Sequence, residues 1–139
     1  MLESKLHDEA DCTRLCIDFA YHLDARRYAG VLDLFTADGK FDRLGTVFGG
    51  RDEISRFLEG RPADVVTRHL CTNIRISVQS ADEATGVCYV LFFSGKAGAD
   101  ARLPIPPSPP GVVEYHDIFS RTAAGWRIRE RRIAPVFAP

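Results

Sequence analysis

Two polar side chains, Asp24 and His69, stand within apolar stretches of this sequence, and a cluster of arginines (Arg127, Arg129, Arg131 and Arg132) lies near the C-terminus. All are of types that do acid–base or anion chemistry. Asp24 closes an apolar-patterned segment, His69 lies among valine, leucine and cysteine, and Arg131 belongs to a group of arginines near the C-terminus. A carboxylate and an imidazole exchange protons near neutral pH, and a guanidinium stabilises anions. Each residue also fits a structural role. Asp24 suits a solvated or helix-capping group, His69 a structural histidine, and Arg131 an arginine that is solvated or paired with Glu130.

The sequence has none of the common motifs that identify a site on their own. There is no glycine-rich phosphate loop, no G-x-S-x-G turn and no H-E-x-x-H metal spacing. The four cysteines (Cys12, Cys16, Cys71 and Cys88) contain no C-x2-C pair. We therefore expect four reduced, mostly buried thiols that pack as small hydrophobic side chains, without a metal site or a disulfide framework.

Length and composition favour one ordinary globular domain spanning residues 1–139. The chain has a mass of 15.5 kDa, 45% hydrophobic and 27% charged residues, a net charge of −1 and a pI near 6.4. This balance excludes the strong positive field that attracts nucleic acid or a membrane surface. The polar, acid-containing start does not resemble a secretory signal, and no apolar run is long enough for a membrane span. A cytoplasmic protein is expected.

The order of apolar patterns predicts an α+β fold with the helices first. Apolar residues recur every three or four positions within residues 8–27, and shorter patterns predict helices at 28–35 and 53–58. A turn is expected at 37–39, followed by a short strand or hairpin at 41–48. Stretches rich in β-branched and aromatic residues then predict long antiparallel strands, at residues 65–79, 85–94, 112–122 and 126–133.

Two strands need an irregularity to place their side chains on one face. His69 and Cys71 have the opposite parity to Ile74 and Ile76, so a β-bulge is expected near Thr72-Asn73. Arg131 likewise has the wrong parity to share a face with the last-strand tryptophan unless a bulge or an inward turn near the end of the strand separates them. Residues 103–111 hold five of the eight prolines and predict a stiff, extended loop, serving either as a plain connection or as a lid or subunit arm.

Several motifs in one order resemble the SnoaL-like branch of the nuclear-transport-factor-2-like superfamily over nearly the whole chain. In the first half they are Tyr21-His22-Leu23-Asp24-Ala25-Arg26-Arg27-Tyr28, then Leu34-Phe35-Thr36-Ala37-Asp38-Gly39, then Gly49-Gly50-Arg51-Asp52-Glu53-Ile54. In the second half they are Arg68-His69-Leu70-Cys71-Thr72-Asn73-Ile74-Arg75, Ser80-Ala81-Asp82 and Gly125-Trp126-Arg127-Ile128. The resemblance implies a cone in which three N-terminal helices pack against a strongly curved, mainly antiparallel sheet around an apolar pocket.

The resemblance also implies site residues and a reaction. In hexachlorocyclohexane dehydrochlorinase, scytalone dehydratase and bile-acid dehydratase an Asp–His dyad is the general base, and Asp24 and His69 occupy its two positions here. An arginine of the dehydrochlorinase pocket corresponds to Arg131. The expected activity is a cofactor-independent elimination or isomerisation on a small hydrophobic, cyclic molecule. The pocket wall is assigned by position and aromatic character to Tyr21, Phe41, Phe48, Tyr89 and Tyr115.

The sequence departs from the enzymes of this family at two positions. Some dehydratases have a tyrosine or lysine where this chain has Phe19, and scytalone dehydratase takes a second histidine from the strand that here carries Cys88. Three alternatives therefore stay open: a polyketide-cyclase-like enzyme, a non-catalytic ligand-binding or assembly module of the same fold, and a relative of the small subunit of ring-hydroxylating dioxygenases. A homodimer paired through the outer face of the sheet is expected from the family.

Overall fold

The computed structural model describes all residues, 1–139. Along the chain there are two helices, two strands, a third helix and four further strands. The helices are α1 (Leu2–Asp24), α2 (Tyr28–Asp33) and α3 (Arg51–Glu59). The strands are β1 (Phe35–Arg43), β2 (Thr46–Gly49), β3 (Val65–Val78), β4 (Glu83–Lys96), β5 (Gly111–Thr122) and β6 (Gly125–Phe137).

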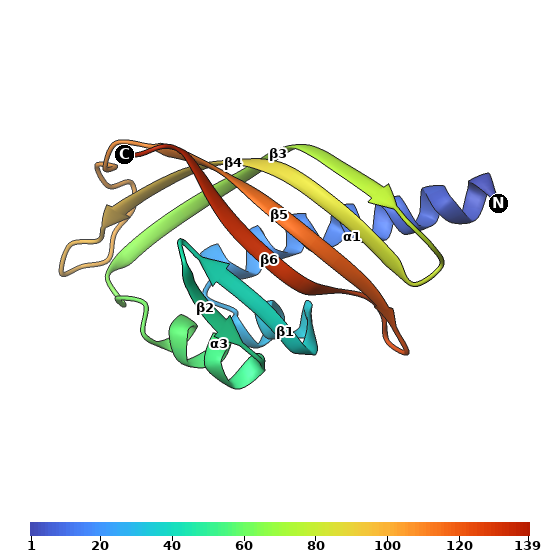
Figure 1. Ribbon diagram of the computed structural model, residues 1–139. Helices are drawn as coiled ribbons and strands as arrows, with labels where there is room; N and C mark the ends of the chain where they lie inside the picture. Colours follow the sequence, from blue (N-terminus) through green and yellow to red (C-terminus); the bar gives the residue numbers. More distant parts are fainter.

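All strands form one sheet in the order β2-β1-β6-β5-β4-β3. Every neighbouring pair is antiparallel except β1 with β6, which is parallel. The long strands β3 to β6 curve over α1, whose N-terminal turns extend past the end of the sheet at which β3 turns into β4 (Figure 1). The helices thus cover one face, called the inner face here, and leave an uncovered outer face. The predicted α+β architecture with a curved sheet is confirmed.

Helix α1 buries one stripe of side chains against the inner face, and this stripe sets the position of Asp24. Its buried hydrophobic residues recur at helical spacing: Cys12, Leu15, Cys16, Phe19, Ala20 and Leu23. Beyond Asp24 the helix stops, because Arg26 has a φ of 58°, in the left-handed region. That conformation costs a non-glycine residue about 1–2 kcal/mol. The Arg26 guanidinium bonds the carbonyl of Val65, 2.7 Å away, which ties the helix end to the start of β3.

The bulge predicted in β3 is present, and of the two alternatives for the last strand the structure has a bulge in β6. In β3 the register with β4 shifts between Thr72 and Arg75, and Asn73 has a φ of 52°. In β6, Ile118 of β5 faces Glu130 whereas Phe119 faces Ile128, so Arg129 is the extra residue. An extra residue reverses the parity of everything that follows it on the strand. Arg131 therefore turns to the inner face and is fully buried.

The turn expected at residues 37–39 is wrong, because these residues belong to β1. The strand begins at Phe35, and its pairing with β6 shifts between Phe35 and Lys40. A Cβ at Gly39 would come within 3.1 Å of both the Phe35 side chain and the Ile128 carbonyl oxygen. The glycine thus serves close packing inside the irregular strand and not a turn.

Two further features complete the fold. Residues 97–110 form no helix or strand, as the prolines predicted, and the Ser108 amide bonds the Ser94 carbonyl at 2.6 Å. The loop thus lies against the end of β4; a role as a lid stays a prediction.

None of the helices combines the length and apolar character that a membrane crossing requires.

Candidate active site

Asp24 and His69 meet on the inner side of the sheet although they lie on different elements. Asp24 is the last residue of α1, and His69 is the fifth residue of β3. Asp24 Oδ1 lies 2.6 Å from His69 Nδ1, and Asp24 Oδ2 accepts the His69 backbone N–H at 2.8 Å. Only 15% of the His69 side chain and 11% of the Asp24 side chain are exposed. The carboxylate thus accepts hydrogen bonds from both the ring and the backbone of His69, which joins the end of α1 to β3.

Hydrogen bonds keep the Asp24 carboxylate charged despite its burial. Burial raises the pKa of this carboxyl, but bonds from the His69 ring, the His69 backbone and the Thr67 hydroxyl outweigh burial and hold the pKa below its ordinary value. Because the carboxylate can only accept, the proton between the two side chains resides on His69 Nδ1 when the ring is neutral. The lone pair of that neutral ring is therefore on Nε2.

The Nε2 edge of His69 has no hydrogen bond to the protein, whereas Nδ1 is occupied by Asp24. The ring stacks on Phe92, with 6.2 Å between ring centroids and 26° between planes. Phe92 is also the residue opposite His69 in the β3–β4 register. A half-buried imidazole of fixed tautomer, with one face against an aromatic ring, is arranged to accept a proton at Nε2.

Arg131 lies deeper on the same inner face and is paired with Asp117. Its Nε and Nη2 each lie 2.8 Å from one carboxylate oxygen, and both side chains are at most 1% exposed. Burial opposes the charge on Arg131, but the carboxylate raises its pKa well above the ordinary value. The guanidinium carbon lies 4.4 Å from the ring centroids of both Phe19 and Tyr115, and Nη1 has no hydrogen-bond partner.

Two cysteines lie beside the ion pair on the inner face. Cys71, two residues after His69 on the same side of β3, contacts the backbone carbonyl of Cys16 at 3.7 Å. The Cys16 thiol in turn lies 3.5 Å from Arg131 Nη2. All four cysteines are free, and no three histidine, cysteine or acidic side chains are grouped so that they could hold a metal ion.

Of the five aromatic residues predicted to line the pocket, three lie on the inner side. Phe41 packs edge-on against Phe19, Phe48 contacts Phe41 with 6.5 Å between ring centroids, and Tyr115 covers Arg131. These three belong to or pack against the main hydrophobic cluster. They therefore belong to the packed core on the inner side of the sheet.

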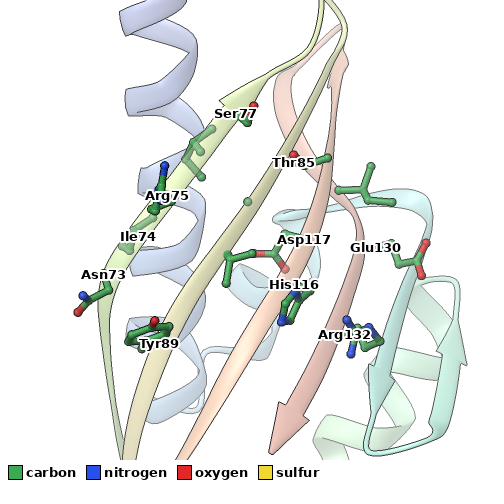
Figure 2. A pocket seen from close by; sticks show the side chains of 14 residues that line it. Asn73, Ile74, Arg75, Ser77, Thr85, Tyr89, His116, Asp117, Glu130 and Arg132 are labelled. Atoms are coloured by element: carbon green, nitrogen blue, oxygen red, sulfur yellow. The ribbon is translucent and has the colours of Figure 1, made fainter. Parts of the chain in front are cut away.

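The structure corrects the assignment of Tyr21 and Tyr89. Tyr21 is 57% exposed because it lies off the buried stripe of α1. Tyr89 is 45% exposed because it alternates with the inward-facing Cys88 and Val90 on β4. Figure 2 shows Tyr89 on the outer face, where it lines a hollow of about 1010 Å³ together with His116 and Arg132. This hollow is on the opposite side of the sheet from the dyad.

Sequence reasoning missed three polar residues that support the site. Thr67 donates to Asp24 Oδ1 at 2.9 Å, Arg61 donates to Thr67, and Asp117 neutralises Arg131. Thr67 shares the strand parity of His69, and Asp117 shares that of Tyr115, so alternation could have found both. Arg61 lies in the loop after α3, and its role depends on contacts between distant segments that no local pattern reveals.

The lowered pKa of Asp24 predicts a specific pH dependence of stability. A carboxyl whose pKa falls on folding stabilises the protein above the ordinary aspartate value of about 3.9, and this contribution is lost as pH falls through the lower folded value. Urea unfolding should therefore show that the free energy of unfolding of wild type exceeds that of Asp24→Asn by less at pH 3 than at pH 7. An unchanged difference would contradict the charged, hydrogen-bonded state of Asp24. Asp11→Asn, at an exposed position on α1, is the matched control and should change little at either pH.

Three N-terminal helices packed inside a strongly curved six-stranded sheet define the nuclear-transport-factor-2-like class of folds, also described as cystatin-like. The profile of the SnoaL-like domain matches residues 4–132, and the chain belongs to this family. No curated protein sequence matches the chain.

Several solved structures share this architecture. A protein from Novosphingobium aromaticivorans provisionally described as a scytalone dehydratase is 23% identical, with a TM-score of 0.85 over 99% of this chain and 89% of that one. A second protein from that organism, with a cystatin-like fold, is 22% identical, with a TM-score of 0.80 over 96% and 84%. A provisionally described dehydratase from Streptomyces avermitilis is 20% identical, with a TM-score of 0.81 over 95% and 99%. At these identities the likeness is one of fold.

Proposed function

We propose that this protein is a cofactor-independent lyase or isomerase that removes a proton from a small hydrophobic, cyclic substrate. The observation that carries the proposal is the Asp24–His69 contact: the 2.6 Å bond to Nδ1 leaves Nε2 as the one free basic atom of a half-buried imidazole. Membership of the SnoaL-like family and the fold likeness to proteins described as dehydratases support the same reaction class.

The proposed elimination begins when His69 Nε2 takes a proton from a carbon of the substrate. The electron pair of the broken C–H bond forms a carbon–carbon double bond as the bond to the leaving group on the next carbon breaks. The Asp24 carboxylate stabilises the imidazolium that forms. A halide departs as the anion, whereas a hydroxyl recovers the proton from the imidazolium and departs as water. In an isomerisation the same imidazolium returns the proton to another carbon.

Arg131 is proposed to stabilise the negative charge that develops on the substrate. Asp117 occupies its Nε and Nη2, so Nη1 is the donor left for an oxyanion or a halide. Arg131 is fully buried with the rings of Phe19 and Tyr115 near its guanidinium, so substrate contact with Nη1 requires neighbouring side chains to move. The aromatic surroundings favour an apolar substrate with a single polar substituent at the reacting end.

Incubation with cyclic β-hydroxyketones and with chlorinated cyclohexanes tests the proposed reaction class. We expect an unsaturated product, detected by mass spectrometry as loss of water or of hydrogen chloride, from wild type and not from His69→Gln. Saturable binding of these compounds without any product from either protein would contradict the proposal and favour the non-catalytic binding module.

We also propose that the protein forms a homodimer through the outer face of the sheet. This face exposes Leu70 and Tyr89, which are 49% and 45% accessible, and Tyr89 lines the hollow of Figure 2. It carries charges of both signs, including Arg132 and Glu130, so two copies can place opposite charges together. Light scattering should give twice the chain mass for wild type and the single mass for Tyr89→Glu. A wild-type monomer at micromolar concentration would contradict this prediction.

A further inference from the structure

The Asp24 carboxylate is held by a chain of hydrogen bonds that begins outside the dyad. Thr67 lies two residues before His69 on β3, so both side chains point to the inner face. The Thr67 hydroxyl donates to Asp24 Oδ1 at 2.9 Å, the same oxygen that accepts from His69 Nδ1. With the His69 backbone N–H on Oδ2, the carboxylate has three protein donors and little freedom to rotate.

Arg61 determines which way the Thr67 hydroxyl points. Arg61 Nη2 lies 3.2 Å from Thr67 Oγ1, and a guanidinium can only donate. Thr67 Oγ1 must therefore accept from Arg61, and its single proton is free to go to Asp24. The direction of each bond in the series Arg61 to Thr67 to Asp24 follows from the chemistry of the groups.

The same guanidinium also holds the helix end that carries Asp24. Arg61 Nη1 donates to the Leu23 carbonyl at 3.1 Å and to the Tyr28 hydroxyl at 3.0 Å. A carbonyl at the C-terminus of a helix has no partner within the helix, so a cation there is favourable. One side chain from the loop after α3 thus fixes the end of α1, the start of α2 and the hydroxyl of β3.

We propose that Thr67 and Arg61 are positioning residues of the Asp24–His69 dyad: Arg61 orients the Thr67 hydroxyl, and that hydroxyl locks the plane of the Asp24 carboxylate against His69 Nδ1. This inference rests on the proposed function and deepens it. Both residues act through Asp24, so their loss is expected to affect proton transfer more than substrate binding. Without the hydroxyl, Asp24 Oδ1 keeps the His69 ring as its one donor, so the carboxylate plane is held less firmly against Nδ1 and the ring tautomer is less strictly fixed.

Thr67→Val tests the proposal, because valine keeps the shape and favours a strand while removing the hydroxyl. We expect kcat to fall about tenfold with KM changed less than twofold, and Thr67→Ser to restore kcat. Arg61→Met should give a similar fall. The kcat of the double variant should fall no further than that of the more impaired single variant, because the two residues act in series. Thr46→Val and Arg56→Met, at exposed positions on β2 and α3, are the matched controls.

Three results would each overturn the positioning role. The first is a wild-type kcat in Thr67→Val, and the second is a loss of kcat that Thr67→Ser does not restore. The third is a kcat in the double variant that falls by the product of the two single reductions. A measurement without substrate separates this outcome from failure of the proposed function. The ¹⁵N resonances of the His69 ring should report a mixture of tautomers in Thr67→Val and a single Nδ1–H tautomer in wild type. An unchanged tautomer in Thr67→Val overturns the inference even if His69→Gln abolishes turnover. A changed tautomer supports the inference even if no turnover exists.

Discussion

Replacing His69 with glutamine is expected to lower kcat/KM by about 10²–10⁴-fold, the range that a positioned general base contributes. Glutamine fills similar space and hydrogen bonds but cannot take up a proton at neutral pH, so the C–H bond of the substrate has no base. Asp24→Asn is expected to reduce kcat by a smaller but still large factor, because an amide does not stabilise the imidazolium and does not hold the tautomer. Steady-state kinetics on the first compound turned over in the screen measures both effects.

His7→Gln is the matched control, since His7 is exposed on the first turns of α1 and has no hydrogen-bond partner there. It should keep the wild-type rate. Circular dichroism and urea unfolding must show that His69→Gln is folded before its rate is interpreted. A folded His69→Gln protein with a rate within threefold of wild type would contradict the role of His69 as base.

The largest effect on stability is expected at the buried pair of Asp117 and Arg131. Asp117→Leu leaves a fully buried guanidinium without its carboxylate and should lower the free energy of unfolding by about 3–5 kcal/mol. The double variant Asp117→Leu with Arg131→Met removes both charges and keeps apolar volume between Phe19 and Tyr115. It should recover most of that loss, because no uncompensated charge remains.

Urea unfolding of the two single variants and the double variant forms a double-mutant cycle for this pair. We expect a coupling energy of several kcal/mol, well above the value of about 0–1 kcal/mol typical of an exposed pair. The exposed pair of Arg129 with Glu83, 3.0 Å apart, provides the matched control. Equal coupling in the two cycles would contradict the view that burial makes the Asp117–Arg131 pair costly to break.

Strand alternation explains why the sequence predicts so much of the inner face. His69 and Ile74 could share that face only with a bulge between them, and Arg131 needed an extra residue or an inward turn, of which β6 has the extra residue. Both irregularities follow from a period of two that fails at an identifiable point. The Asp24 position follows similarly from the end of a helical pattern that packs on the same face.

Contacts between distant segments explain what the sequence does not predict. Tyr21 and Tyr89 are aromatic and close to the right positions, but the exact stripe of α1 and the exact parity of β4 place them outward. Arg61 supports the dyad from a loop 37 positions after Asp24, and nothing in the residues around it distinguishes it from a solvated arginine. Such roles depend on where loops pack, which local patterns do not determine.

The protonation of the His69 ring nitrogens tests the central claim most directly. ¹⁵N NMR of histidine-labelled protein, recorded at a pH where the ring is neutral, distinguishes a protonated from an unprotonated Nδ1 or Nε2. We predict that His69 in wild type carries its proton on Nδ1 and has a bare Nε2, and that Asp24→Asn loses this preference. A proton on Nε2 in wild type, or the same tautomer in both proteins, would contradict a dyad in which Asp24 prepares His69 to act as a base.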